Sequence, residues 1–119
     1  MGFKDLINPP EKEGKEKHVP VIEAQGKAKK GEWIEVSVVV GKEVAHPNTL
    51  EHHIEGISLY FKEDGEKPVY KVADFTSFAV HTDSCVSLRI RVEGSGSLHA
   101  LSSCNIHGLW ESEKRIEVE

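Results

Sequence analysis

Imidazole and thiol side chains are concentrated in three short segments that lie far apart in this chain of 119 residues. The segments span residues 16–20, 46–53 and 104–108, and their candidate metal ligands are His18, His46, His52, Cys104 and His107. Neutral imidazole binds zinc, copper, iron and nickel, and a cysteine thiolate adds a soft, strongly donating sulfur. We therefore predict that folding closes the three segments around one metal ion.

The sequence Cys104-Asn105-Ile106-His107 is the most specific of these segments. A turn of this spacing places sulfur and imidazole within reach of one ion, and the amides that follow the cysteine can donate hydrogen bonds to its sulfur. The cysteine would bind as the thiolate, because a coordinating thiol loses its proton. The other cysteine, Cys85, has no ligand-type neighbour at close spacing, and we expect an ordinary buried or half-buried thiol there.

The adjacent histidines His52 and His53 are expected to have different roles. Successive side chains of an extended segment point to opposite faces, so both rings cannot reach one metal if this stretch is extended. One of the pair is then structural or exposed.

The number of ligands bears on the identity of the metal. A structural zinc site needs four ligands and stays possible if one histidine is a spectator. A copper site of the cupredoxin type would use one upstream histidine with Cys104, His107 and a weak axial methionine. However, the only methionine is Met1, and His18 and His52 would have no role. Four histidines and one thiolate leave one position open, which suits redox-active iron, whereas the alternatives are a copper electron carrier and a zinc-stabilised binding domain.

Short strands must position these ligands. Runs of β-branched and aromatic residues predict strands near residues 19–21, 33–40, 54–61, 69–75, 77–81, 86–92, 98–102 and 115–118. Turns are expected at residues 26–31, 64–68 and 94–96. No segment shows sustained helical spacing of apolar residues. The pattern predicts an all-β fold, an immunoglobulin-like antiparallel β-sandwich of about seven strands, whose loops gather at its ends and can bring distant motifs together.

The chain is expected to consist of a polar N-terminal arm or loop, residues 1–17, and one domain, residues 18–119. Its 15 basic and 20 acidic residues give a formal net charge of −5, which argues against nucleic acid as a partner. No apolar run approaches the roughly 18 residues of a membrane-spanning helix, and the first residues do not resemble a signal peptide. We therefore expect a cytoplasmic protein without a membrane partner.

Taken together, the three motifs resemble those of the superoxide reductases, the neelaredoxin and desulfoferrodoxin family. The matching residues are Glu-Lys-His-Val-Pro at 16–20, His-Pro-Asn-x-x-Glu-His-His-Ile at 46–54 and Cys-Asn-x-His-Gly-Leu-Trp at 104–110. The resemblance runs from about residue 16 to residue 111, nearly the whole chain after the arm. It implies a seven-stranded immunoglobulin-like sandwich, in agreement with the strand pattern.

The resemblance also implies a mononuclear non-haem iron, one per chain, that is held by four equatorial imidazoles and an axial cysteinate. Carried over position by position, the equatorial ligands would be His18, His46, His52 and His107, and Cys104 would be axial. The adjacent histidine at position 53 is not a ligand in that pattern.

The resemblance also implies functional roles for the two charged residues before His18. Glu16 resembles the glutamate that occupies the open iron position after oxidation, and Lys17 resembles the lysine that attracts the anionic substrate. On composition alone, both would belong to a solvated, charge-rich loop. Two-iron relatives carry an additional cysteine-rich domain at the N-terminus, and residues 1–17 contain no cysteine, so the one-iron type is expected.

The implied activity is the one-electron reduction of superoxide to hydrogen peroxide, without dismutation to oxygen. Ferrous iron with one thiolate carries a net charge of about +1, which favours an anionic substrate, and Lys17 would add a second positive charge. The implied electron donor is a small iron–sulfur-type carrier such as rubredoxin. One-iron relatives are commonly homotetramers, so we expect a homo-oligomer.

Overall fold

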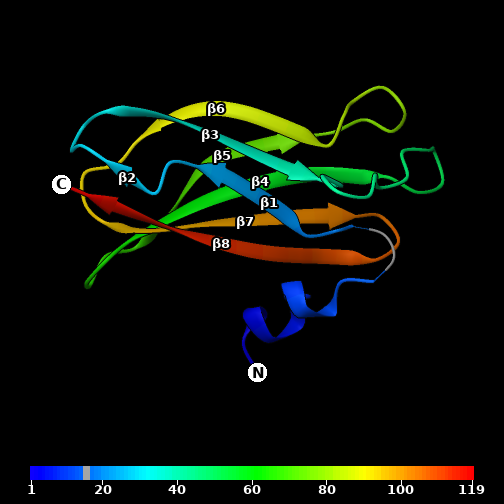
Figure 1. Ribbon diagram of the computed structural model, residues 1–119. Coiled ribbons are helices and arrows are strands. Elements are labelled where there is room, and N and C mark those ends of the chain that lie inside the picture. Colours follow the sequence, from blue (N-terminus) through cyan, green and yellow to red (C-terminus); the bar gives the residue numbers. More distant parts are fainter. Residues whose placement is uncertain (15–16) are drawn as a thin grey trace.

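The computed structural model describes residues 1–14 and 17–119, which form two β-sheets preceded by a short arm (Figure 1). The arm contains two single-turn 3-10 helices, η1 (Phe3–Leu6) and η2 (Pro10–Lys12). The strands are β1 (Pro20–Ala24), β2 (Lys27–Ala28), β3 (Trp33–Val40), β4 (Ile54–Glu63), β5 (Val69–Thr76), β6 (Cys85–Arg91), β7 (Gly96–Cys104) and β8 (Gly108–Val118).

The strands are arranged as a sandwich of a smaller and a larger sheet. The three-stranded sheet has the order β1-β3-β6, and the five-stranded sheet has the order β2-β8-β7-β4-β5. The short pairing of β2 with β8 is parallel, and the other strand pairs are antiparallel. The predicted all-β sandwich of immunoglobulin-like type is confirmed.

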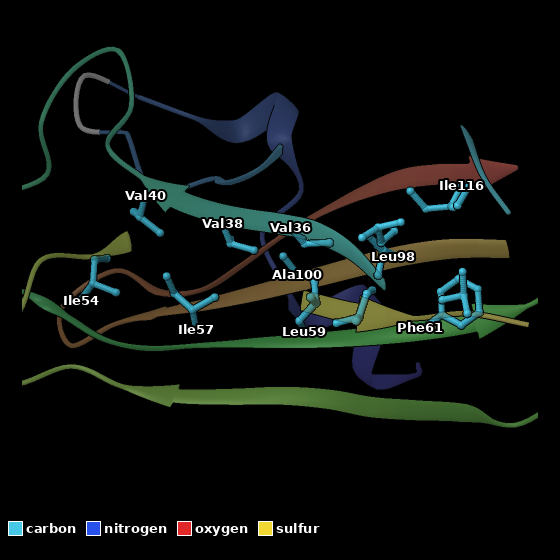
Figure 2. Close-up of a cluster of buried hydrophobic side chains, with 14 of the residues drawn as sticks. Val36, Val38, Val40, Ile54, Ile57, Leu59, Phe61, Leu98, Ala100 and Ile116 are labelled. Atoms are coloured by element: carbon cyan, nitrogen blue, oxygen red, sulfur yellow. The ribbon is translucent and has the colours of Figure 1, made fainter. Parts of the chain in front are cut away.

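Alternate residues of the facing strands fill the space between the two sheets. Val36 and Val38 of β3 point toward Leu59, Leu98 and Ile116 of the larger sheet, and each of these side chains is at most 1% exposed (Figure 2). Complete burial of a Val, Leu or Ile side chain contributes roughly 1.5–3 kcal/mol. This alternation fixes the register, because a slip of one residue would turn the apolar face toward water.

A β-bulge interrupts the alternation near the start of β4. The pairing of β4 with β7 shifts between Ile54 and Gly56, so Ile54 and Ile57 both face the core although three positions separate them. A Cβ atom on Gly56 would lie 2.7 Å from the backbone oxygen of Phe75, so only glycine fits at this bulge. The bulge therefore sets the direction in which the chain enters β4 from the segment with His46 and His52.

The expected strand at residues 77–81 is wrong. These residues form a closed loop in which the Thr82 amide donates to the Phe78 carbonyl and the Asn48 side chain bonds the backbone of Val80 and Thr82. Val80 has φ +72°, which a strand cannot contain. Hydrogen bonds within the loop and from the Asn48 side chain thus satisfy these backbone groups without a neighbouring strand.

Three further boundaries differ from the expected ones. The last strand begins at Gly108 rather than residue 115, because β8 pairs with β7 from Gly108 to Ile116. The short strand β2 lies within a stretch expected to be a turn. The arm, expected to be an irregular loop, has two 3-10 turns and pairs with Trp110 of β8 through Asn8. Neither 3-10 helix, nor any helix among residues 1–14 and 17–119, has the length and apolar character to cross a membrane.

Candidate metal centre

One end of the sandwich brings together ligand-type side chains from three separate segments. The ligand atoms of His18, His46, His52 and Cys104 all lie within 4.8 Å of one another. Only 5% of His18, 9% of His46 and 3% of Cys104 is exposed. Figure 1 shows this end on the right, where β7 turns into β8.

His107 completes a closed ring of four imidazoles. The ring centroids are separated by 4.9 Å for His18 and His46, 4.8 Å for His46 and His52, 5.0 Å for His52 and His107, and 4.9 Å for His107 and His18. Neighbouring rings are inclined to each other by 63° to 80°. Four nearly equal spacings and steep angles are the arrangement expected of imidazoles that point their nitrogens at a shared centre.

The chain before β1 carries His18 across the inner face of the larger sheet. The hydroxyl of Ser102, which is fully buried, donates a hydrogen bond of 2.8 Å to the His18 carbonyl. The His18 ring is stacked on the indole of Trp110, with centroids 4.7 Å apart and an angle of 11°. Ser102 and Trp110 are directly opposite each other in β7 and β8, so the pairing of these strands positions both residues that contact His18.

The loop before β4 supplies His46 and His52. The Nδ1 atom of His46 lies 2.8 Å from the carbonyl oxygen of Pro47. A carbonyl oxygen only accepts, so Nδ1 carries the hydrogen and the lone pair of the ring is on Nε2. A tight turn precedes His52, whose amide donates to the hydroxyl and the carbonyl of Thr49.

His53 points away from the ring of imidazoles, as the sequence predicts for one member of the pair. Its Nδ1 atom lies 3.1 Å from the Thr49 carbonyl, and its backbone amide donates to the side chain of Asn105. The expected reason, alternation along an extended strand, does not apply because residues 51–53 precede β4. The hydrogen-bonded turn at Thr49 separates the two rings instead.

Cys104 ends the inward-facing alternation of β7, directly after Leu98, Ala100 and Ser102. The backbone amide of His107 donates to its sulfur at 3.4 Å, and the His107 Nδ1 atom lies 3.9 Å from the same sulfur. An amide hydrogen bond of this kind stabilises the thiolate form and tunes its donation to a metal. The turn expected from Cys104-x-x-His107 is therefore present.

The donor set fits a transition metal of intermediate softness, such as iron. Metal–nitrogen bonds of about 2.1 Å at right angles place neighbouring nitrogens about 3.0 Å apart, and His18 Nε2 lies 3.1 Å from His107 Nδ1. Imidazole and thiolate are ligands for iron, copper and zinc, whereas calcium and magnesium require oxygen. Five donors exceed the four of a closed structural zinc site.

Of the two charged residues before His18, only Lys17 is described by the structure. Glu16 lies outside the described residues. The Lys17 ammonium lies 3.7 Å from a carboxylate oxygen of Glu13, and the other oxygen of that carboxylate accepts from the Val19 amide at 3.3 Å. Lys17 is adjacent to His18 in sequence, and its ammonium group is paired with the carboxylate of Glu13 in the arm.

Several residues that support the site had no role in the sequence analysis. Trp110 donates from Nε1 to the His107 carbonyl at 3.2 Å, and the Asn8 amide donates to the same carbonyl at 3.3 Å. Trp110 lies within the third motif, and Ser102 occupies the same strand face as Cys104. The sequence could therefore have indicated that both residues lie near the site. The contact of Asn8 crosses 99 positions, and no local pattern could have indicated it.

Comparison with known proteins gives concordant results for sequence and structure. Residues 10–113 match the family model described as Desulfoferrodoxin. The chain is 48% identical to the putative superoxide reductase of Thermotoga maritima, over 88% of this chain and 89% of that protein. It is 46% identical to the superoxide reductase of Pyrococcus furiosus, over 86% of this chain and 90% of that protein.

A solved structure with the same fold is the superoxide reductase (neelaredoxin) of Ignicoccus hospitalis. It superimposes with a TM-score of 0.92 at 36% identity and covers the whole of both chains. The similarity in fold therefore extends over both sheets and the 3-10 helices that precede them.

Proposed function

The chain belongs to the desulfoferrodoxin family of superoxide reductases, and we propose that its five-residue cluster holds one iron ion at which superoxide is reduced to hydrogen peroxide. The residues that would hold the iron are His18, His46, His52, His107 and Cys104. The observation that carries this assignment is the closed ring of imidazoles beside a buried sulfur that accepts a backbone hydrogen bond.

Iron bound by imidazoles and a thiolate supplies a one-electron couple and a position for a small anion. The balanced reaction takes one superoxide, one electron and two protons to one hydrogen peroxide, and it releases no oxygen. Two backbone groups of the chain would prepare the ligands for the metal. The Pro47 carbonyl fixes the tautomer of His46, and the His107 amide stabilises the thiolate form of Cys104 by a hydrogen bond to its sulfur. We propose that the protons come from water.

We propose that Lys17 attracts superoxide electrostatically and that Glu16 binds at the open position of oxidised iron. Lys17 is 30% exposed, so its charge is partly available to solvent, and its partner Glu13 limits how far the ammonium can move. The role of Glu16 is supported by its place in the Glu-Lys-His-Val-Pro motif.

Electrons must come from outside, because a single metal centre holds one reducing equivalent per cycle. We propose a rubredoxin-like donor and a homotetrameric assembly, which are supported by the motif resemblance. We also propose a cytoplasmic location. We also propose that residues 1–17 are an arm joined to an iron-binding domain of residues 18–119. The bonds of Asn8 to the His107 and Leu109 carbonyls support an arm that closes against the site.

Metal analysis of protein purified without oxygen tests the assignment. We expect close to one iron per chain, colour in the oxidised protein from sulfur-to-iron charge transfer, and bleaching by dithionite. Reduced protein should consume superoxide and form peroxide without oxygen. Copper at one per chain would favour an electron carrier instead, and colourless protein with zinc would favour a structural site.

A further inference from the structure

Asn105 directly follows the proposed ligand Cys104 and connects the end of β7 to the loop that carries the proposed ligand His52. Its side-chain oxygen accepts from the His53 amide at 2.9 Å, and its side-chain nitrogen donates to the Glu51 carbonyl at 3.0 Å. Its backbone amide also donates to the His53 carbonyl at 3.2 Å. A single residue thus makes three hydrogen bonds to the segment on either side of His52.

The orientation of the Asn105 amide follows from its partners. A backbone N–H can only donate and a backbone carbonyl can only accept, so the oxygen must face His53 and the nitrogen must face Glu51. Both functional groups are therefore engaged with the backbone. Asn105 is exposed and contributes no apolar burial, so its contacts serve the geometry of the loops rather than the core.

These bonds begin where the β-ladder stops. The last pair of β4 and β7 on this side is Ile54 with Cys104, and Asn105 is the first residue after the end of β7. Beyond the ladder, the side chain of Asn105 continues the connection toward the Thr49–His52 turn. The backbone before and after His52 is thereby held at a fixed distance from the residue that follows Cys104.

We infer that Asn105 is a positioning residue that fixes the His52 imidazole relative to the Cys104 sulfur. This inference rests on the proposed function, in which both side chains bind the same iron. Residues that orient metal ligands typically change metal affinity by about 10- to 100-fold when they are mutated. Asn105 acts from outside the ligand set, through the backbone on both sides of one ligand.

Asn105→Ala tests the inference by removing both side-chain hydrogen bonds and retaining the backbone. We expect iron affinity, measured by competition with a chelator, to fall about tenfold or more. The sulfur-to-iron absorption band of the oxidised protein should also shift, because the ring of His52 is no longer held. In metal-free protein, hydrogen exchange of the His53 amide should become faster than in the unmodified chain.

Ser95→Ala is the matched control. The Ser95 hydroxyl also makes two bonds to backbone groups, because it accepts from the Val118 amide and donates to the Val118 carbonyl, but it lies at the opposite end of the sandwich from the proposed ligands. We expect metal-free stability to fall by a similar amount in both variants and iron affinity to fall clearly more in Asn105→Ala. Equal losses of iron affinity would show general loosening of the loops and overturn the inference.

An Asn105→Ala protein with unchanged iron affinity and an unchanged absorption band would also overturn it. If that variant does not fold, Asn105→Ser supplies a turn-compatible residue that is too short to make both bonds, and the same outcomes apply. Failure of the unmodified chain to bind iron would instead overturn the proposed function, and the inference with it.

Discussion

The two ends of the sandwich both gather polar side chains, and they differ in burial. At the end where β7 turns into β8, His18 and Cys104 are 5% and 3% exposed. At the opposite end, Arg115 donates to Asp64 at 2.6 Å and to Glu117 at 2.9 Å, and the side chains of these three residues are 48%, 56% and 54% exposed. The first cluster comes from three segments that are distant in sequence, and the second lies at one end of the larger sheet.

Burial decides what each cluster can do. Hydrogen bonds from Arg115 lower the pKa of Asp64 and of Glu117, and the same contacts raise the pKa of Arg115. All three groups are already charged at neutral pH, and water screens their attraction, so the cluster performs no chemistry. At the other end, a buried cysteine lies beside four imidazoles, and this set of donors is suited to a transition metal.

Cys104→Ser should have the largest effect, because it removes the only sulfur of the buried cluster. A serine hydroxyl keeps its proton at neutral pH and is a poor ligand for iron. We expect loss of the charge-transfer colour and of superoxide reduction, measured by absorbance and by superoxide decay. Cys85→Ser is the control and should keep both, since Cys85 lies on β6 outside the cluster. Retained colour and activity in the Cys104 variant would contradict the axial assignment.

Trp110→Phe should have an intermediate effect confined to the buried end. The variant keeps an aromatic ring beside His18 and loses the hydrogen bond to the His107 carbonyl. We expect the free energy of unfolding to fall by about 1 kcal/mol, together with weaker iron binding in chelator competition. Trp33→Phe changes an indole that is 51% exposed on β3, and it should leave iron binding unchanged. Equal iron binding by the unmodified chain, Trp110→Phe and Trp33→Phe would show that the Trp110 hydrogen bond does not support the site.

Lys17→Ala should slow superoxide capture without loss of the metal. One positive charge near the site is expected to change the second-order rate about two- to tenfold at low ionic strength, and salt should reduce the difference. Pulse radiolysis at several salt concentrations measures both effects. Lys67→Ala removes the same charge from the opposite end, where Lys67 lies 3.6 Å from Glu63, and should be silent. Identical salt dependence in the two variants would exclude a local role for Lys17.

Arg115→Met should have the smallest effect, because it changes the exposed end. The lowered pKa of Asp64 contributes stability above its ordinary pKa of 3.8, and this contribution is lost as the pH falls through the lower value in the folded protein. We expect a slightly lower melting temperature at pH 7, a difference that disappears in acid, and unchanged iron content. A large, pH-independent loss of stability would show that the ion pairs matter more than their exposure indicates.

The sequence predicted more of the metal site than of the connections around it. The motifs contained the histidines and the cysteine whose side chains converge, whereas the strand expected at residues 98–102 stopped short of Cys104, which is the last residue of β7. The strand expected at residues 77–81 failed because the side chain of Asn48, about 30 positions earlier, bonds that backbone. The sequence analysis expected His52 and His53 to have different roles because of alternation along a strand. In the structure, the hydrogen-bonded turn at Thr49 separates the two rings instead.

Residue chemistry and strand alternation are properties of neighbouring residues, so the sequence by itself determined the ligand types, the apolar faces and the all-β class. Only the tertiary structure decided how the loops meet. The contacts of Trp110, Asn8 and Asn105 join positions far apart along the chain, and their geometry exists only after β4, β7 and β8 have paired in register.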